Sequence, residues 1–221
     1  MKSFKHSLQS PLSMGLVQRD RRFPKQHMSV QRFKMSVNWY QQQFHKHKEL
    51  SLFHSVWELY FATLLEADPQ VRGFVPQPFV FRIGKRRYTP DFYVERQGQI
   101  QLVEIKRDKE LDESGHWTNH YIVNAMTDYC DSQGWSFQVV ANSWVKKQQK
   151  IVERWLPIIR CLQHHKELLT DQQESHVLNF LSEQQDCAIS DLIDPFDREF
   201  KLPIEIAVYR LAIAGQISLN L

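Results

Sequence analysis

The sequence predicts a mixed α/β fold followed by a smaller, mostly helical part. Three observations support this: an amphipathic helix at 51–67, strand-like stretches between 71 and 107, and a helix and a fourth strand between 116 and 141. Elements in this order form a small mixed sheet with helices packed on it. The 221 residues, 42% of them hydrophobic, suffice for one medium domain and a small one.

The first helix is defined by apolar spacing. Residues 51–67 carry apolar side chains at positions that share one helical face, and Asp68-Pro69 ends the pattern. The next stretch, 71–83, is strand-like but contains two prolines, so we expect an edge strand or a bent strand. The positions on the apolar helical face are Phe53, Val56, Trp57, Tyr60, Phe61 and Leu64.

A hairpin is predicted next, with strands at 87–95 and 99–107 around Gln97-Gly98, a pair that suits a tight turn. After about residue 166 only short helices and one short strand are expected, a layout that fits a winged-helix domain with an abbreviated wing. The later elements are a helix at 116–133, a strand at 135–141, helices at 144–165, 172–185, 187–193 and 203–214, and a strand at 216–219.

Charge divides the chain into three parts. Residues 1–50 hold ten Lys and Arg against two acids, a net +8, and we expect a basic arm there. Residues 51–165, the predicted α/β domain, are nearly balanced at +1. Residues 166–221 carry −6, and their third helix is mostly apolar. A recognition helix usually offers polar or basic side chains to DNA, so we predict that this tail binds protein.

Several classes of protein are disfavoured. The chain has no apolar run long enough for a membrane span and no secretory signal. Cys130, Cys161 and Cys187 are far apart and form no CxxC pair, which favours a reduced, cytoplasmic setting. Glycine-rich nucleotide-binding motifs are absent.

The residues that suggest chemistry lie on the predicted hairpin. A two-residue loop at Gln97-Gly98 places Asp91 directly opposite Glu104, with Cβ atoms about 4.5–5.5 Å apart. Lys106 lies two residues beyond Glu104 and therefore projects from the same face, while Val103 and Ile105 project from the other.

Two carboxylates in this arrangement repel each other, and a divalent cation removes the conflict. Such an ion activates water and stabilises charge on a phosphodiester, and a nearby ammonium assists. The alternative is a surface hairpin with a salt-bridged ladder. Basic side chains at Arg82, Lys85, Arg86 and Arg87, and at Lys146 and Lys147, either hold DNA phosphates or simply keep the surface soluble.

These residues resemble the TnsA endonuclease family of Tn7-like transposons, which belongs to the PD-(D/E)xK, restriction-endonuclease-like nucleases. The resemblance covers roughly 50–165, and the tail agrees only in layout. The motifs, in chain order, are Ser55-Val56-Trp57-Glu58-Leu59, Leu64-Leu65-Glu66-Ala67-Asp68-Pro69, Phe74, Gln77-Pro78, Tyr88-Thr89-Pro90-Asp91-Phe92 and Val103-Glu104-Ile105-Lys106.

The resemblance implies a restriction-endonuclease-like fold and a set of site residues. Glu58, Asp91 and Glu104, with the backbone carbonyl of Ile105, would hold Mg²⁺, for which Mn²⁺ would substitute, and Lys106 would be the catalytic lysine. Glu66 competes with Glu58 for the helix position. We prefer Glu58, because Glu66 is in the last turn, where a solvated acid is the simpler reading.

The family's role would be cleavage at the 5′ ends of transposon DNA in the bacterial cytoplasm. The implied partners are transposon-end DNA, a TnsB-like DDE transposase subunit and a TnsC-like AAA+ regulator. Two alternatives stay open: a stand-alone restriction or repair nuclease, and a non-catalytic adaptor that binds DNA.

Overall fold

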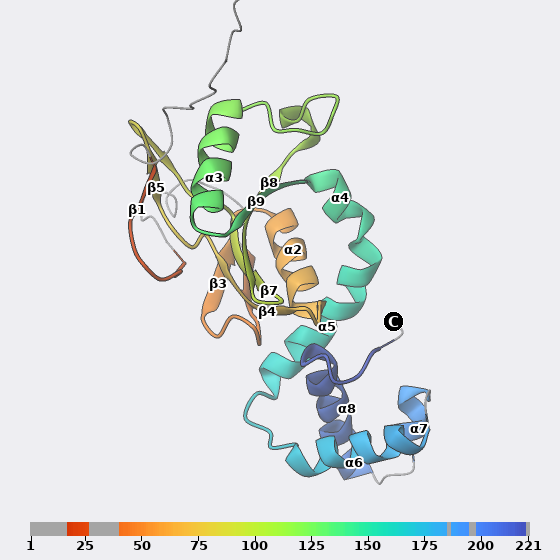
Figure 1. Cartoon of the computed structure of the whole chain (residues 1–221). Helices are drawn as coiled ribbons and strands as arrows, with labels where there is room; N and C mark the ends of the chain where they lie inside the picture. The colour runs from red at the N-terminus through yellow and green to blue at the C-terminus, as the bar shows by residue number, and fades with distance from the viewer. Residues whose placement is uncertain (1–16, 27–39, 185–186, 195–197, 220–221) are drawn as a thin grey trace, which may run out of the picture.

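The computed structural model describes residues 17–26, 40–184, 187–194 and 198–219. Its centre is a mixed four-stranded sheet with helices on both faces, so the predicted mixed α/β fold is confirmed (Figure 1). The three leading strands are antiparallel and the last runs parallel to its neighbour. In sheet order the strands are β4 (Val71–Pro76), β7 (Phe92–Arg96), β8 (Gln99–Lys106) and β9 (Ser136–Ala141).

Each face of the sheet has its own core. One core contains Phe92 and Val103 together with α2, α4 and α5, whereas Leu102 packs in the other core with α3. The alternation of Leu102 and Val103 along β8 therefore feeds both layers. The helices are α2 (Val56–Ala67), α3 (His120–Ser132), α4 (Asn142–Lys147) and α5 (Gln149–His164).

The hairpin between β7 and β8 has the predicted register. Arg96 pairs with Gln99 and Phe92 with Val103, which leaves Gln97-Gly98 as a two-residue turn. Both turn residues have positive φ, 49° and 75°, as a type I′ turn requires. Such a turn matches the twist of the flanking strands and thereby fixes which side chains share a face.

Described pieces of the expected basic arm, 1–50, belong to the folded domain. They form β1 (Val17–Arg19), which pairs with β5 (Phe81–Ile83), and β2 (Tyr40–Gln43), which pairs with β3 (Leu50–Phe53) across the boundary expected at residue 50. Phe44 is buried in the core that contains α2. The rest of the expected arm, 1–16 and 27–39, lies outside the described residues.

Other element boundaries differ from the predictions for local reasons. The first helix starts after Ser55, whose hydroxyl accepts from the Glu58 amide, so the predicted start at residue 51 is wrong. Likewise α3 starts after the cap Asn119 and not at 116. The predicted strand 87–95 is broken into β6 (Arg86–Tyr88) and β7 around Pro90. A short 3-10 helix, η1 (Asp108–Glu110), follows β8.

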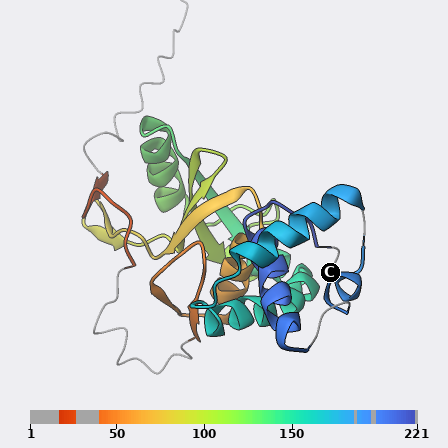
Figure 2. The same ribbon diagram turned by 90° about the horizontal axis from the view of Figure 1, so that it is seen from below.

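The tail consists of α6 (Asp171–Glu183), α7 (Ile189–Ile193) and α8 (Arg198–Ile213) around its own small core (Figure 2). The strand predicted at 216–219 is wrong: the Gln216 amide turns back to the Leu211 carbonyl at 2.9 Å. A wing strand is therefore missing from the described residues, and a winged-helix domain is not confirmed. In the described part of the chain, no helix is long and apolar enough to cross a membrane.

Candidate active site

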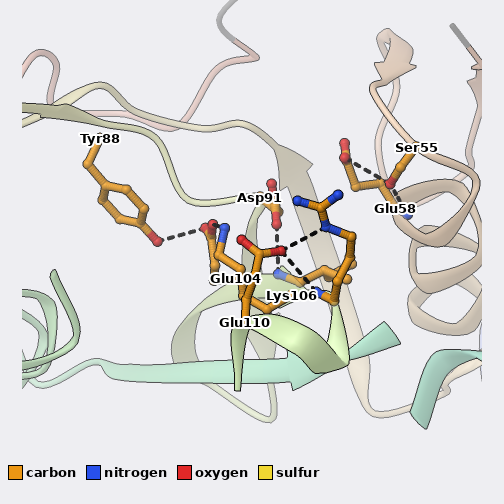
Figure 3. A network of polar contacts seen from close by, with 9 residues as sticks. Ser55, Glu58, Tyr88, Asp91, Glu104, Lys106 and Glu110 are labelled. Carbon is orange, nitrogen blue, oxygen red and sulfur yellow. Dashed lines mark hydrogen bonds and ion pairs between the residues drawn. The ribbon is translucent and has the colours of Figure 1, made fainter. Parts of the chain in front are cut away.

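Asp91 and Glu104 lie together at one end of the β7–β8 hairpin (Figure 3). Asp91 directly precedes Phe92, whose partner is Val103, so the pairing register brings it opposite Glu104. The Oδ2 atom of Asp91 accepts a hydrogen bond from the Ile105 amide at 2.7 Å. This bond holds one carboxylate against the backbone of the strand that carries the other.

Glu104 is almost completely buried and both of its carboxylate oxygens have protein partners. The Tyr88 hydroxyl donates to Oε2 at 2.7 Å, and Lys106 Nζ lies 2.5 Å from Oε1. Lys106 also lies over the Trp117 ring, 4.4 Å from its centroid. The prediction that Glu104 and Lys106 share a face is therefore confirmed, and Ile105 packs on the opposite side.

Glu58 reaches the same region from the first turn of α2. Its carboxylate accepts from the Ser55 hydroxyl at 3.0 Å and from the His54 amide at 3.1 Å, while its amide donates to Ser55. The pair of bonds between Ser55 and Glu58 is similar to a capping box, except that the carboxylate accepts from the His54 amide and not from the Ser55 amide. Glu58 therefore stabilises the start of α2, and its negative charge also raises the pKa of Asp91.

Glu66 lies elsewhere and is not the solvated helix-end acid that we expected. Its side chain is fully buried and accepts from the amides of His45 and Lys46 at 2.6 and 3.0 Å. The segment before β3 folds over the end of α2 and supplies these donors. Glu66 lines a separate pocket with Ile159 and Ile213, and of the two helix acids only Glu58 contributes to the raised pKa of Asp91.

The surroundings of Asp91 and Glu104 disfavour ionisation of both carboxyl groups. Burial, together with the negative charges of Glu104 and Glu58, raises the pKa of Asp91 well above its usual range. Burial also raises the pKa of Glu104, although Lys106 and Tyr88 oppose the shift. Burial acts to lower the pKa of Lys106, but the Glu104 charge outweighs it, so that pKa is raised and the side chain is a cation.

Gln77 is a member of this network to which the sequence alone gave no role. Gln77 is buried and has a positive φ of 46°, and its backbone N–H donates to the Asp91 backbone carbonyl at 2.7 Å. The side-chain nitrogen of Gln77 lies 2.5 Å from Nδ1 of His54, and the backbone N–H of His54 donates to the Glu58 carboxylate. Gln77 thus links the backbone of Asp91 to the start of α2. The available signal was the Gln77-Pro78 pair.

Two other contributors, Tyr88 and Trp117, were also missed as site residues. Tyr88 is partly buried and donates to Glu104, and desolvation together with the Glu104 charge raises its pKa well above the usual range. Its position three residues before Asp91 was the only hint. Trp117 comes from the loop before α3, where it forms an isolated bridge with Leu111, and nothing in the local pattern marks it.

The basic residues predicted to hold DNA occupy two places. Arg82, Lys85, Arg86 and Arg87 are exposed on the β5–β6 hairpin, which leads directly into Tyr88. Arg86 lies over the Tyr121 ring at 5.4 Å.

Lys146 and Lys147 are exposed in the last turn of α4. The start of that helix contacts η1, where the Asp108 amide donates to Asn142 Oδ1 at 3.1 Å. The contacts found among the described residues do not connect either lysine with Asp91 or Glu104.

The oxygen atoms of Asp91, Glu104 and the Ile105 carbonyl are the type of donor that a hard divalent cation prefers. Among the described residues, no group of three or more His, Cys, Asp or Glu side chains is arranged to hold a metal ion. Two carboxylates and a nearby backbone carbonyl are nevertheless ligands that Mg²⁺ accepts, and the raised pKa values of the carboxyls come first from their burial. A metal ion that binds Oε1 of Glu104 would replace the Lys106 ammonium at that oxygen.

Comparison with known proteins agrees with this geometry. Residues 68–142 match the family model described as the TnsA-like endonuclease N terminal. The matched range contains Gln77, Tyr88, Asp91, Glu104 and Lys106, whereas Glu58 precedes it. No curated protein matches the chain at a significant level. Over residues 68–142 the chain is therefore similar to the N-terminal domain of the TnsA-like endonucleases.

Proposed function

We propose that this protein is a metal-dependent DNA endonuclease that cuts at the 5′ ends of a Tn7-like transposon during excision. The observation that carries the proposal is the meeting of Asp91, Glu104 and Lys106 on one face of the β7–β8 hairpin, inside the range that matches the TnsA-like endonuclease domain. Glu104 is buried and Asp91 is half-buried. Two such carboxylates placed together are costly as a purely structural device, because like charges next to each other oppose folding.

Asp91 and Glu104, with the Ile105 carbonyl, would hold Mg²⁺, and Glu58 would complete the set from α2. When bound, a divalent ion supplies an activated water and stabilises charge that develops on the phosphate. Asp91 keeps one oxygen on the Ile105 amide, which fixes its orientation. Mn²⁺ would substitute, since both ions accept oxygen ligands.

Lys106 has a role that changes with the state of the site. In the structure it neutralises Glu104, with Trp117 beneath its ammonium. Once Glu104 is engaged elsewhere, the same ammonium is free to donate to a phosphate oxygen or to orient the attacking water. Its raised pKa keeps it protonated and suits a donor, not a base.

The β5–β6 hairpin is the proposed DNA contact. Its exposed cations, Arg82, Lys85, Arg86 and Arg87, offer charge to phosphates, and β6 ends at the residue that holds Glu104. Lys146 and Lys147 on α4 are a second proposed contact. Phosphate contacts by these cations would position a DNA strand for cleavage without reading its sequence.

The remaining parts of the proposal concern partners. A TnsA-like domain implies a Tn7-type system, with transposon-end DNA, a TnsB-like DDE transposase and a TnsC-like AAA+ regulator. We propose that residues 166–221 form a small helical interaction domain of winged-helix layout that contacts one of these proteins. Its support is the net charge of −6 and an α8 whose apolar residues are mostly buried in the tail's own core.

The test is nicking of labelled transposon-end DNA in Mg²⁺ or Mn²⁺, with the cognate transposase and regulator present. Wild type is compared with Asp91→Ala and with Asp128→Ala, a control at an exposed acid on α3. We expect 5′-end cleavage by wild type and the control, and none by Asp91→Ala. Equal cleavage by all three would reject the nuclease and leave the non-catalytic adaptor. Cleavage without any partner would indicate a stand-alone nuclease.

A further inference from the structure

Strand β9 lies at an edge of the four-stranded sheet. Within the described ranges, no strand pairs with its outer side. Its sequence, Ser136-Phe137-Gln138-Val139-Val140-Ala141, contains no charge and no proline. Exposed edge strands are normally protected by charged residues, proline or a bulge, since their unpaired backbone groups otherwise recruit another strand. The edge of β9 therefore lacks the usual protection against strand addition.

A groove of about 790 Å³ accompanies this edge. We call it the β9 groove; besides β9 itself, its walls come mainly from α2, α4 and α5, with Arg96, Gln101 and Gly115 completing the lining. Its apolar lining includes Phe61, Trp144, Ile151 and Trp155, and Trp144 and Ile151 are 47% and 43% exposed. Large apolar side chains left open beside an unpaired strand offer both of the contacts that bind an extended peptide: backbone pairing and side-chain pockets.

The rim of the β9 groove is positive. Arg154 lies three residues after Ile151 on α5 and therefore flanks it on the helix surface. Lys150 directly precedes Ile151, and Lys147 is the last residue of α4. All three cations are exposed.

The one acid between Lys147 and Arg154, Glu153, accepts a hydrogen bond from the Gln149 side chain at 2.6 Å. The acid in the lining, Asp68, is already paired with Arg96 at 2.7 Å. An incoming acidic side chain therefore meets cations without a competing free carboxylate in the lining.

We propose that the β9 groove binds an extended segment of a partner protein in which apolar residues alternate with acidic ones. The segment would pair with β9 as an added strand, place its apolar side chains against Trp144 and Ile151, and direct its acids toward Lys147, Lys150 and Arg154. Charge complementarity favours this occupant. A second copy of this chain would bring the same three cations to the interface, and DNA would leave the apolar floor unmatched.

This inference does not depend on nuclease activity, because it rests on the sheet edge, the lining and the rim. Neither Asp91 nor Glu104 lines the groove, although Glu104 on β8 is the pairing partner of Val139, which does. Loss of cleavage in the Asp91→Ala variant would leave it unaffected. The two proposals can therefore fail separately.

The test is selection from a phage-displayed library of random decapeptides against the full-length chain. Ile151→Asp serves for counter-selection, and Leu169→Asp, at a residue 83% exposed outside the groove, is the matched control. We expect peptides with alternating apolar residues and net negative charge. They should bind the control as wild type does and Ile151→Asp at least tenfold more weakly. Circular dichroism shows whether each variant is folded, and Trp144→Ser replaces Ile151→Asp if that chain is not.

Hydrogen exchange of the selected complex tests the binding mode. Added-strand pairing predicts slower exchange of amides in 136–141, and a peptide N-methylated at alternate residues should lose most of its affinity. A Lys150→Glu/Arg154→Glu chain should bind the acidic peptides at least tenfold more weakly.

Four results would overturn the inference. These are failure to enrich peptides that need Trp144 or Ile151, enrichment of basic peptides, protection of β9 by duplex DNA instead of peptide, and protection of β9 by dimerisation of the chain alone.

Discussion

The Gln77 amide donates to the Asp91 carbonyl at 2.7 Å while Gln77 itself holds a φ of 46°. A side chain other than glycine in this left-handed region costs about 1–2 kcal/mol. Backbone strain of this kind persists only where surrounding contacts impose it, and it is concentrated at functional sites. Here the imposed contact joins the loop after β4 to the residue that begins the candidate site.

Substitution at Gln77 separates the strain from the side-chain contact. Gln77→Gly and Gln77→Ala both remove the contact with His54, but only glycine relieves the left-handed backbone. We expect the glycine variant to be more stable than the alanine variant by about 1 kcal/mol in urea unfolding, and nicking to fall by a similar factor in both. An alanine variant as stable as the glycine variant would show that the backbone is unstrained.

Asp91→Asn should stabilise the metal-free protein at neutral pH while abolishing nicking. The unfolded carboxyl has a pKa of about 3.9, and burial with Glu104 and Glu58 raises the folded value well above this. The contribution of protonated Asp91 to the free energy of unfolding is therefore fully present below the pKa of the unfolded state. It is lost as the pH rises through the higher pKa of the folded state. Asn removes this loss, at most about 1.4 kcal/mol per pH unit for one proton.

The check is guanidinium unfolding of both chains in EDTA from pH 4 to pH 8. The stability difference between Asp91→Asn and wild type should grow with pH, because only the wild-type carboxyl must ionise. Asp128→Asn, at an exposed acid, should follow wild type throughout. A variant that is less stable than wild type at pH 8 would mean that the charge of Asp91 is already compensated within the fold.

Divalent cations should stabilise wild type and leave Asp91→Asn almost unchanged. An ion that binds only the folded state adds about 2.7 kcal/mol at a hundred times its Kd. Because protons compete for carboxylates whose pKa values are raised, the gain in melting temperature from Mg²⁺ or Mn²⁺ should shrink as pH falls. Calorimetry at pH 6 and pH 8 measures both effects, and equal gains in the two chains would place the ion elsewhere.

Arg86→Ala/Arg87→Ala should weaken DNA binding with little sequence dependence. Each lost phosphate contact lowers the slope of log affinity against log salt by about 1, so the slope should fall by about 1 to 2. Arg72→Ala, at an exposed arginine on β4 that pairs with Glu95, is the control. Fluorescence anisotropy with a labelled duplex measures the slope. An unchanged slope would remove the β5–β6 hairpin from the DNA contact.

Local patterns predicted the hairpin because its register depends only on a two-residue turn and a period of two. The pairing through Gln97-Gly98 and the shared face of Glu104 and Lys106 needed no distant information. The start of α2 was harder, since Phe53 fits both the helical apolar spacing and the strand that it forms. Ser55 decides the boundary through its capping bond.

The errors came from contacts between distant segments. Burial of Glu66 depends on amides about twenty residues earlier, which no helical pattern within α2 reveals. The role of Gln77 depends on where Asp91 and His54 meet in space. The missing wing strand reflects the turn of Gln216 back onto α8, so the apolar residues after that helix pack as a cap and not as a strand.

The reciprocal hydrogen bonds between Ser55 and Glu58 connect the first turn of α2 with a carboxylate whose charge acts on Asp91. A cation that draws the Glu58 carboxylate toward Asp91 would break its hydrogen bonds with the Ser55 hydroxyl and the His54 amide. The start of α2 would then lose two of the bonds that hold it. Filling the site would loosen that turn while tightening the hairpin. Hydrogen exchange of the backbone amides at the start of α2 would therefore report how much of the metal site is filled, because these amides would exchange faster as the ion binds.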